Sequence, residues 1–410
     1  QGFEQSVSIY SDGIYRGRGH QSRMPFMDLE RIEVLRGPQP ILFGKNAIAG
    51  AVNMISAKPT DTFEGSVRAS YEFETEESVA DLVLSGPFSD TFGARLAVRY
   101  RESNGYVDNL TLGRSEPQRE ELSGRLTLAF TPSDRFDATL KIEHGSFDVD
   151  GRQVEIFGEL PAAPIRRPNG TTSTPVPGTA GLTYSQILGL AFGQGPTVAN
   201  NTLDYRRSSN GDFSYIDMTE AALTLNWRFD GMTLTSVTGY SEYELDELCD
   251  CDFTGASVIV AGLLETYDQF SQELRLASDT DGRLSWIAGL FYQDYDLKAP
   301  DYVLIPSNSI IVPLVNGLAG PGAGNAMGGT ANPRDFQQKS ELFAVFAQVS
   351  YDLTDAWRVT AGGRWSTEDK SGLRANDLTA GGGGASLPVG LIDGLWNNVL
   401  GIQRHSISGK

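Results

Sequence analysis

The sequence predicts an all-β fold in which a small, glycine-punctuated unit precedes a long series of antiparallel strands. Two observations predict this fold: apolar and polar residues alternate along most segments after Glu64, and short connections between these segments alternate with long ones. Strict alternation is typical of strands that have one apolar face and one polar face. No apolar run approaches the ~18 residues that would indicate a membrane-spanning helix.

The first unit covers residues 1–60 and mixes short extended stretches with turns and loops. Ser11, Asp12 and Gly13 form a turn signal between two such stretches. The elements expected in this unit are, in order, strands at 6–10 and 14–15, a basic glycine-rich loop at 16–26, an alternating apolar and charged segment at 28–35, and an apolar strand at 51–55.

The second unit covers residues 61–410 and carries the alternation. Charged residues recur on one face of each segment, which is difficult to reconcile with a soluble sheet buried on both faces. The pattern is typical of transmembrane barrel strands with lipid on one side and water or a plug on the other. The clearest segments are 94–100, 122–130, 136–143 and 223–229. In them we expect lipid-facing Leu96, Val98, Leu126, Leu128, Leu140 and Ile142, and lumen-facing Arg95, Arg99, Arg125 and Lys141.

The connections between the predicted strands alternate in length. Outer-membrane barrels have short periplasmic turns and long extracellular loops, and on this template the chain contains about eleven strands. Short turns are expected at 87–91, 132–135, 230–231, 278–282 and 353–355. Long loops are expected at 102–120, 145–215, 242–268 and 294–338, with a further excursion at 371–410 that contains the glycines at 381–384.

The segment that joins the two units contains four short motifs: ERIEVLRGP at 30–38, LFG at 42–44, AGAVN at 49–53 and Lys-Pro at 58–59. These motifs, followed by the strand series, resemble the plug and barrel of TonB-dependent outer-membrane receptors. The resemblance implies that 1–60 is the C-terminal part of an α+β plug, with a short helical turn and then a strand at 28–35, and that 61–410 is the N-terminal half of a barrel. Barrels that hold a plug have about 22 strands, so we expect the chain to be a fragment.

The same resemblance implies active import across the outer membrane of a Gram-negative bacterium. The expected partners are the TonB complex (TonB, ExbB and ExbD), acting through an N-terminal segment that the chain lacks, and outer-membrane lipid and lipopolysaccharide. The expected substrate is a ferric siderophore, with cobalamin or an oligosaccharide as alternatives. A passive porin and a surface adhesin remain open as rival classes, and no cofactor is expected.

Two groups of residues are candidates for the site. The plug resemblance implies charges that lock the plug to the barrel wall, although solvated charge on an amphipathic segment is the alternative. The residues assigned to this motif are Glu30, Arg31, Glu33, Arg36, Gly37, Pro38, Gly44, Gly50 and Asn53. By the same resemblance the basic loop is the plug apex, where Arg16, Arg18, His20, Gln21 and Arg23 would attract an anionic ligand. The alternative is that its arginines pair with acids of the barrel wall.

Composition excludes several other functions. A net charge of -19 argues against a nucleic-acid partner. The three histidines are scattered, and no serine or cysteine nucleophile stands beside one, so neither a metal site nor catalysis is expected. Cys249 and Cys251 remain open between a disulfide with each other, disulfides with partners elsewhere and a soft-metal clip.

Overall fold

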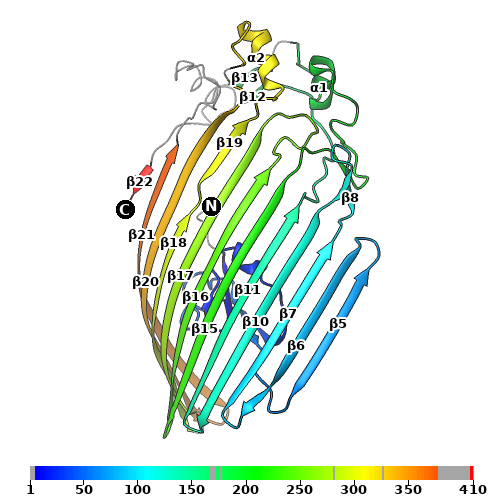
Figure 1. The fold of residues 1–410 in the computed structure, drawn as a ribbon. Helices are drawn as coiled ribbons and strands as arrows, with labels where there is room; N and C mark the ends of the chain where they lie inside the picture. The colour runs from blue at the N-terminus through cyan, green and yellow to red at the C-terminus, as the bar shows by residue number, and fades with distance from the viewer. Residues whose placement is uncertain are drawn as a thin grey trace.

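The computed structural model describes residues 5–166, 172–175, 178–279, 282–325, 327–376 and 407–409. They form a small sheet that lies against the concave face of a large, curved sheet (Figure 1). We call residues 5–56 with the small sheet the inner unit, and the large sheet the wall. In the described residues, no helix is both long enough and apolar enough to cross a membrane.

The inner unit is a four-stranded sheet in the order β2-β1-β4-β3. Its strands are β1 (Val7–Ser11), β2 (Ile14–Tyr15), β3 (Leu29–Arg36) and β4 (Gly50–Ser56). The helical turn expected within 28–35 is wrong, because Leu29–Arg36 pairs along its length with β4 as a strand. The one helical turn described in this unit is η1 (His20–Arg23), which lies in the preceding basic loop.

The wall is a sheet of thirteen strands in which each long strand pairs antiparallel with the next. Eleven strands are long, which confirms the expected number, and β19 (Asp301–Ile305) and β22 (Ile407–Gly409) are short. Within the described residues the sheet is open, because β5 and β22 lie at opposite ends of the strand order. The long strands are β5 (Glu64–Glu72), β6 (Glu77–Ser89), β7 (Phe92–Ser103), β10 (Gln118–Ser133), β11 (Phe136–Asp150), β15 (Phe213–Phe229), β16 (Met232–Cys249), β17 (Val260–Ser278), β18 (Leu284–Lys298), β20 (Thr330–Thr354) and β21 (Trp357–Asn376).

Tight turns gather at one end of the wall and, apart from the short turn at 73–76 between β5 and β6, long connections gather at the other (Figure 1). The long connections carry the short elements β8 (Val107–Asn109), β9 (Arg114–Glu116), β12 (Ile165–Arg166), β13 (Thr172–Ser173), β14 (Arg206–Arg207), α1 (Tyr184–Phe192) and α2 (Ile311–Ala319). The loop expected at 242–268 is too long, since β16 continues to Cys249 and β17 begins at Val260. Its acidic residues indicated a loop, but they occupy alternate positions of a strand. Likewise 371–376 continues β21, while 377–406 and part of the turn at 278–282 lie outside the described residues.

The predicted facing of the wall residues is confirmed where the inner unit provides contacts. Arg95, Arg125 and Lys141 each contact an atom of the inner unit. Leu126 and Ile142, on the opposite face of their strands, are 38% and 42% exposed. The alternation therefore reports which side of the wall each side chain occupies.

Candidate functional site

The inner unit contacts the wall through the loop between β2 and β3, which contains most of the predicted ligand residues. Gln21 is fully buried, and its side chain donates to Ser241 Oγ at 3.0 Å and accepts from the backbone N–H of Arg18 at 3.0 Å. Gln21 thus fixes the loop to β16. Its described contacts are with the loop and the wall, and the expected ligand contact stays a prediction.

Two arginines and a histidine of this loop rest on aromatic rings of the wall. The guanidinium carbons of Arg18 and Arg23 lie 5.9 Å from the Tyr267 ring centroid and 5.7 Å from that of Phe147. The ring of His20 lies 5.8 Å from that of Tyr243. Contacts of this kind between cations and ring faces orient the cation without neutralising it.

The supporting tyrosines form a row across three strands. The ring centroids of Tyr243 and Tyr267 are 5.3 Å apart, and those of Tyr267 and Tyr295 are 5.5 Å apart. Within the described residues, Arg18 has no carboxylate partner, and Arg23 has one in Glu121 at 3.6 Å. The loop therefore presents positive charge that the nearby wall balances only in part.

Arg16 lies in a different environment from its neighbours in the loop. It is 4% exposed, and its Nε and Nη2 donate to the two oxygens of Glu220 at 3.0 and 3.2 Å. Glu143 lies 3.8 Å away on another side. The described contacts of its guanidinium are thus with carboxylates of the wall, which favours the alternative of wall pairing for Arg16, and the ligand contact stays a prediction.

Arg16 belongs to a buried cluster of charges that joins the inner unit to the wall. Lys141 Nζ lies 2.6 Å from Glu220, 2.9 Å from Asp12 and 3.7 Å from Glu143. Arg125 pairs with Glu143 at 2.8 Å. The charge cluster consists of Arg16, Arg125 and Lys141 with Asp12, Glu143 and Glu220.

The charge cluster contains equal numbers of positive and negative groups, so it is neutral as a whole. Burial alone would raise the pKa of Asp12, but Lys141 and two hydrogen bonds from Ser56 outweigh burial and lower it. Removal of any one member would leave an uncompensated charge away from water. The geometry therefore favours an attachment of the inner unit to the wall that forms or breaks as a whole.

A second attachment lies next to the charge cluster, at the start of β3. Arg95 donates to both oxygens of Asp28 at 2.7 and 2.5 Å. Arg125 reaches the carbonyl oxygens of Met27 and Asp28 at 2.7 and 3.1 Å. Sequence reasoning missed Asp12 and Asp28, although they are the only acidic residues between residues 5 and 29 and the wall was predicted to present inward cations.

The loop that carries the LFG motif attaches the inner unit to β21 of the wall. Lys45 pairs with Glu368 at 2.9 Å, and Arg364 donates to the carbonyl of Ile41 at 3.3 Å. Gly44 has a φ of +69°, and a Cβ there would lie 2.9 Å from the guanidinium of Arg364. Glycine therefore suits this position for both its backbone conformation and the close approach of the wall.

The charges of the ERIEVLRGP motif do not reach the wall within the described residues. Arg31 pairs with Glu30 and, at 2.8 Å, with Glu33, and all three side chains are more than 40% exposed. Asn53 donates to Glu33 at 3.1 Å. Of the other motif positions, Gly37 N–H donates to the carbonyl of Ala49, and a Cβ on Gly50 would lie 2.5 Å from the carbonyl of Leu35. The motif thus orders β3 against β4, and Arg36 and Pro38 lie on either side of Gly37.

A cavity of about 430 Å³ lies between the inner unit and the wall. Asp12 and Lys141 line it, so the charge cluster forms one margin. The other lining residues include Ile55 and Lys58 of the inner unit and Thr139, Thr224, Asn226 and Thr235 of the wall. The inner unit is thus attached to the wall at its edges, and the cavity separates it from the wall between these attachments.

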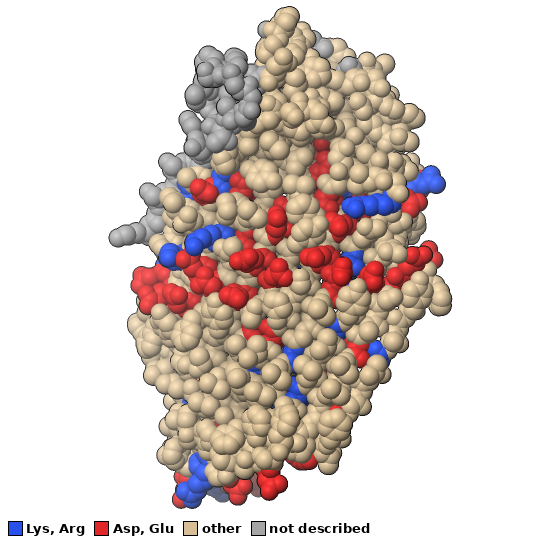
Figure 2. Space-filling view, in the orientation of Figure 1, with Lys and Arg blue, Asp and Glu red and all other residues tan. Residues whose placement is uncertain are grey.

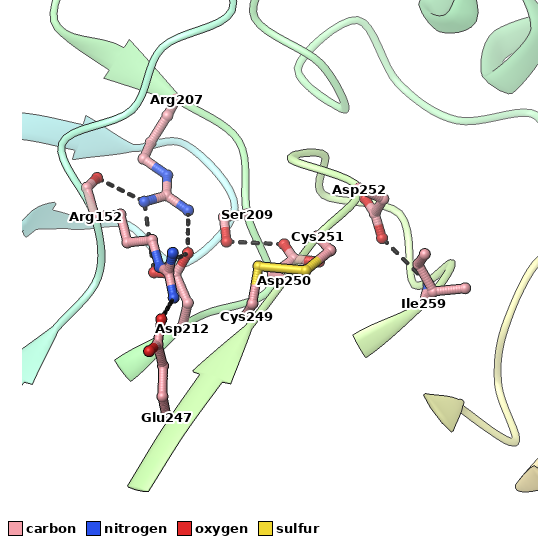
Figure 3. Close-up of a disulfide and its surroundings, with 10 residues drawn as sticks. All are labelled: Arg152, Arg207, Ser209, Asp212, Glu247, Cys249, Asp250, Cys251, Asp252 and Ile259. Carbon is pink, nitrogen blue, oxygen red and sulfur yellow. Dashed lines mark hydrogen bonds and ion pairs between the residues drawn. A yellow bond between two sulfur atoms is a disulfide. The ribbon is translucent and has the colours of Figure 1, made fainter. Parts of the chain in front are cut away.

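A second group of polar contacts ties the long connections together (Figure 3). Arg207 pairs with Asp212 at 2.8 Å, and Arg152 pairs with Glu247 at the end of β16. Cys249 and Cys251 are joined to each other by a disulfide in the turn that follows. The structure brings these loops into contact with one another and not with the inner unit's cations.

Two family descriptions match the chain. The TonB-dependent receptor plug domain matches residues 1–51, and the TonB dependent receptor-like β-barrel matches residues 164–392, more than half of the chain. The ferrienterobactin receptor of Escherichia coli K12 is 27% identical over 379 residues, which cover 85% of this chain and 44% of that protein. Ferric enterobactin receptor PirA of Pseudomonas aeruginosa is 30% identical over 175 residues, which cover 38% of this chain and 22% of that protein.

The chain spans less than half of the length of either relative. Among solved structures, the ferric yersiniabactin uptake receptor FyuA from Yersinia pestis aligns with a TM-score of 0.67 at 16% identity, over 92% of this chain and 50% of that one. This likeness concerns the fold alone. With a plug-like unit attached inside an antiparallel wall and with both family matches, the chain belongs to the family of TonB-dependent receptors.

Proposed function

We propose that this chain is the plug and barrel portion of an outer-membrane receptor that imports a ferric siderophore with energy from the TonB complex. In this proposal residues 1–60 are the C-terminal part of the plug and 61–410 the N-terminal half of the barrel. Members of the family are transport receptors and not enzymes. The observation that carries the proposal is a plug held in the lumen by a buried, neutral charge cluster below a cationic loop.

The direction of the cationic loop supports this assignment. Lys141 of the charge cluster lies near the middle of β11. Phe147, which supports Arg23, lies nearer the end of this strand that carries the long loops. The apex therefore points toward the end that faces the exterior in such barrels. Relatives named as ferric enterobactin receptors support an iron chelate as the substrate.

The outer face of the wall supports a location in the outer membrane. Figure 2 shows a band of acidic side chains across this face, with a zone of few charges below it. Register places these acids opposite one another on neighbouring strands, as in Glu102–Glu120–Asp148, Asp217–Glu244, Glu242–Asp268–Asp296 and Asp294–Glu341. Tyr100, Tyr240 and Tyr292 lie beside the band and donate hydroxyl protons to its acids. Aromatic residues with polar tips are typical of the membrane interface, and the acids suit a lipopolysaccharide surface rich in divalent cations.

Replacing Leu126 by arginine is expected to destabilise the inserted receptor by about 2–4 kcal/mol, because Leu126 faces outward further along β10 than Glu120 of the acidic band. The measurement is folding of the full-length receptor into lipid vesicles along a urea series. Glu120→Arg is the matched control, since Glu120 lies on the same face of β10 within the acidic band. A similar loss for both variants would contradict the membrane placement.

The function itself is tested by uptake of labelled ferric siderophores into cells that express the full-length receptor. We expect uptake that stops in a strain without TonB and after collapse of the proton gradient. A passive porin would instead give uptake that persists under both conditions. An adhesin would give no uptake of any chelate. The plug contacts favour the first outcome, because they obstruct free diffusion along the described wall.

A further inference from the structure

The turn after β16 holds two carboxylates that bind backbone and hydroxyl groups of neighbouring loops. Asp250 is 1% exposed and accepts hydrogen bonds from Ser209 Oγ at 2.8 Å and from the N–H of Asn210 at 2.7 Å. Asp252 accepts from the N–H and hydroxyl of Thr254 at 3.0 and 2.5 Å. It also accepts from the N–H groups of Val258 and Ile259 at 3.3 and 3.4 Å.

Residues 254–259 in turn join two apolar clusters that contain the helices of the long loops. Ala256 packs in a cluster with Leu188 of α1, and Ile259 packs against a cluster with Val315 of α2. The N–H of Gly255 donates to the carbonyl of Val198 at 2.7 Å, and that of Ile310 donates to the carbonyl of Ser257 at 2.9 Å. We call α1, α2 and residues 254–259 the cap.

The cap contains almost no charge, so the two carboxylates at its base have few partners. Segments 168–203, 253–264 and 302–333 contain no Lys, Arg, Asp or Glu. The groups that face the pair from the packed elements are Tyr184 of α1 on the cap side and, on the other side, the pairs Arg207–Asp212 and Arg152–Glu247 (Figure 3). Both arginines are already bound to other carboxylates. Neither therefore neutralises Asp250.

The Cys249–Cys251 disulfide closes a short loop around Asp250, two positions before Asp252 in the chain (Figure 3). Asp250 is 1% exposed and has no Lys or Arg partner within the described residues, so ionising its carboxyl is costly. We propose that Asp250 and Asp252, held by the disulfide, form a proton-dependent latch that joins the cap to the turn at 206–212. A proton on Asp250 keeps the latch closed, and its loss loosens the cap.

The direction of the pH dependence follows from burial. Burial, followed by the charge of Asp252, raises the pKa of Asp250 from 3.8 to about 7, and burial also raises the pKa of Asp252. A group with a raised pKa in the closed state holds more protons there than in the open state. The closed latch is therefore most stable below the ordinary pKa of the carboxyl, and its stability is lost as pH rises through about 7.

Hydrogen exchange of the full-length receptor tests the latch. The amides of Asn210, Val258 and Ile259 report its opening, and those in the middle of β16 serve as an internal reference. After correction for intrinsic exchange rates, we expect opening at pH 8 to exceed opening at pH 5 by about tenfold or more. Equal opening at the two pH values would overturn the proposal.

Variants separate the carboxyl pair from the general stability of the loops. Asp250→Asn keeps both acceptor contacts in a neutral side chain, so we expect a closed cap and no pH dependence between pH 5 and 8. Asp252→Asn provides a second test, and it should weaken the pH dependence because it removes the neighbouring negative charge. Asp246→Asn, on the exposed outer face of the same strand, is the matched control and should retain the wild-type dependence. Wild-type pH dependence in both Asp250→Asn and Asp252→Asn would refute the latch.

The disulfide is tested by Cys249→Ser combined with Cys251→Ser. If the disulfide positions Asp250, the double variant should open faster at pH 5 than the wild type and respond less to pH. Opening identical to that of the wild type would remove the disulfide from the proposal. Exchange in the wall strands should be unchanged in either case, because their ladder does not depend on this turn.

Discussion

Lys141→Met is expected to loosen the plug from the barrel while the barrel strands stay folded. Lys141 is 2% exposed and lies within 3.7 Å of Asp12, Glu143 and Glu220. Without it the charge cluster has a net negative charge at a site where Glu143 and Glu220 are buried. Loss of one partner from a buried charge pair costs about 3–5 kcal/mol. The measurement is the urea midpoint for plug release in the full-length receptor, reported by a probe on the plug.

Two controls distinguish the charge cluster from a general effect of losing a lysine. Lys141→Met combined with Glu220→Gln removes one charge of each sign and should be less damaging than the sum of the single changes by about 1–3 kcal/mol. Lys339→Met removes a lysine that is 69% exposed and paired with Asp296, so its effect should stay within about 0.5 kcal/mol. Strict additivity of the Lys141 and Glu220 changes would show that the cluster does not act as a unit.

The same Lys141 variant should make cells permeable to large antibiotics that the outer membrane normally excludes. The cavity of about 430 Å³ lies beside the charge cluster. When the plug separates from the wall, this cavity opens toward the apex. Permeability that is unchanged despite a lowered midpoint would mean that the LFG loop, through Lys45 and Arg364, holds the plug in place without the cluster.

The barrel could be predicted from the sequence because its physical signal is local. In 122–130 the outward Leu122 and Leu126 are followed by inward polar residues, and this period needs no knowledge of distant partners. Strand ends were less predictable, as β16 shows. Its outer face has the acidic composition of a loop but the period of a strand, with Tyr240, Glu242, Glu244 and Asp246 at alternate positions.

The roles of the apex residues could not be separated from the sequence. Arg16 and Arg18 are equivalent by residue type and lie two positions apart, yet one is in the charge cluster and the other lies over Tyr267. The partner of Arg16 is 204 positions away in the chain. Which cation meets which wall residue depends on how the plug docks, and that follows from tertiary packing alone.

Arg18→Gln combined with Arg23→Gln is expected to weaken binding of an anionic ferric chelate by about tenfold to a hundredfold, since a hydrogen bond to a charged group contributes about 1.5–3 kcal/mol. Both side chains are only partly buried and are supported by aromatic rings, so the plug should remain seated. The measurement is equilibrium binding of labelled chelates to cells that express the full-length receptor. Binding to the wild type should fall as salt rises, because attraction between exposed charges is screened beyond ~8–10 Å. Binding to the variant should depend less on salt.

Arg16→Gln is the matched control, because Arg16 lies in the same loop but is bound to Glu220. We expect this variant to lower the midpoint for plug release and to increase permeability, with little change in the affinity of receptors that remain folded. A neutral chelate provides the second control and should not distinguish Arg18→Gln/Arg23→Gln from the wild type. If the double variant bound every anionic chelate as the wild type does but became permeable, the apex cations would hold the plug to the wall and would not bind the ligand. If it lost affinity without becoming permeable, the apex would be a ligand site whose positive charge is kept free by the separate pairing of Arg16.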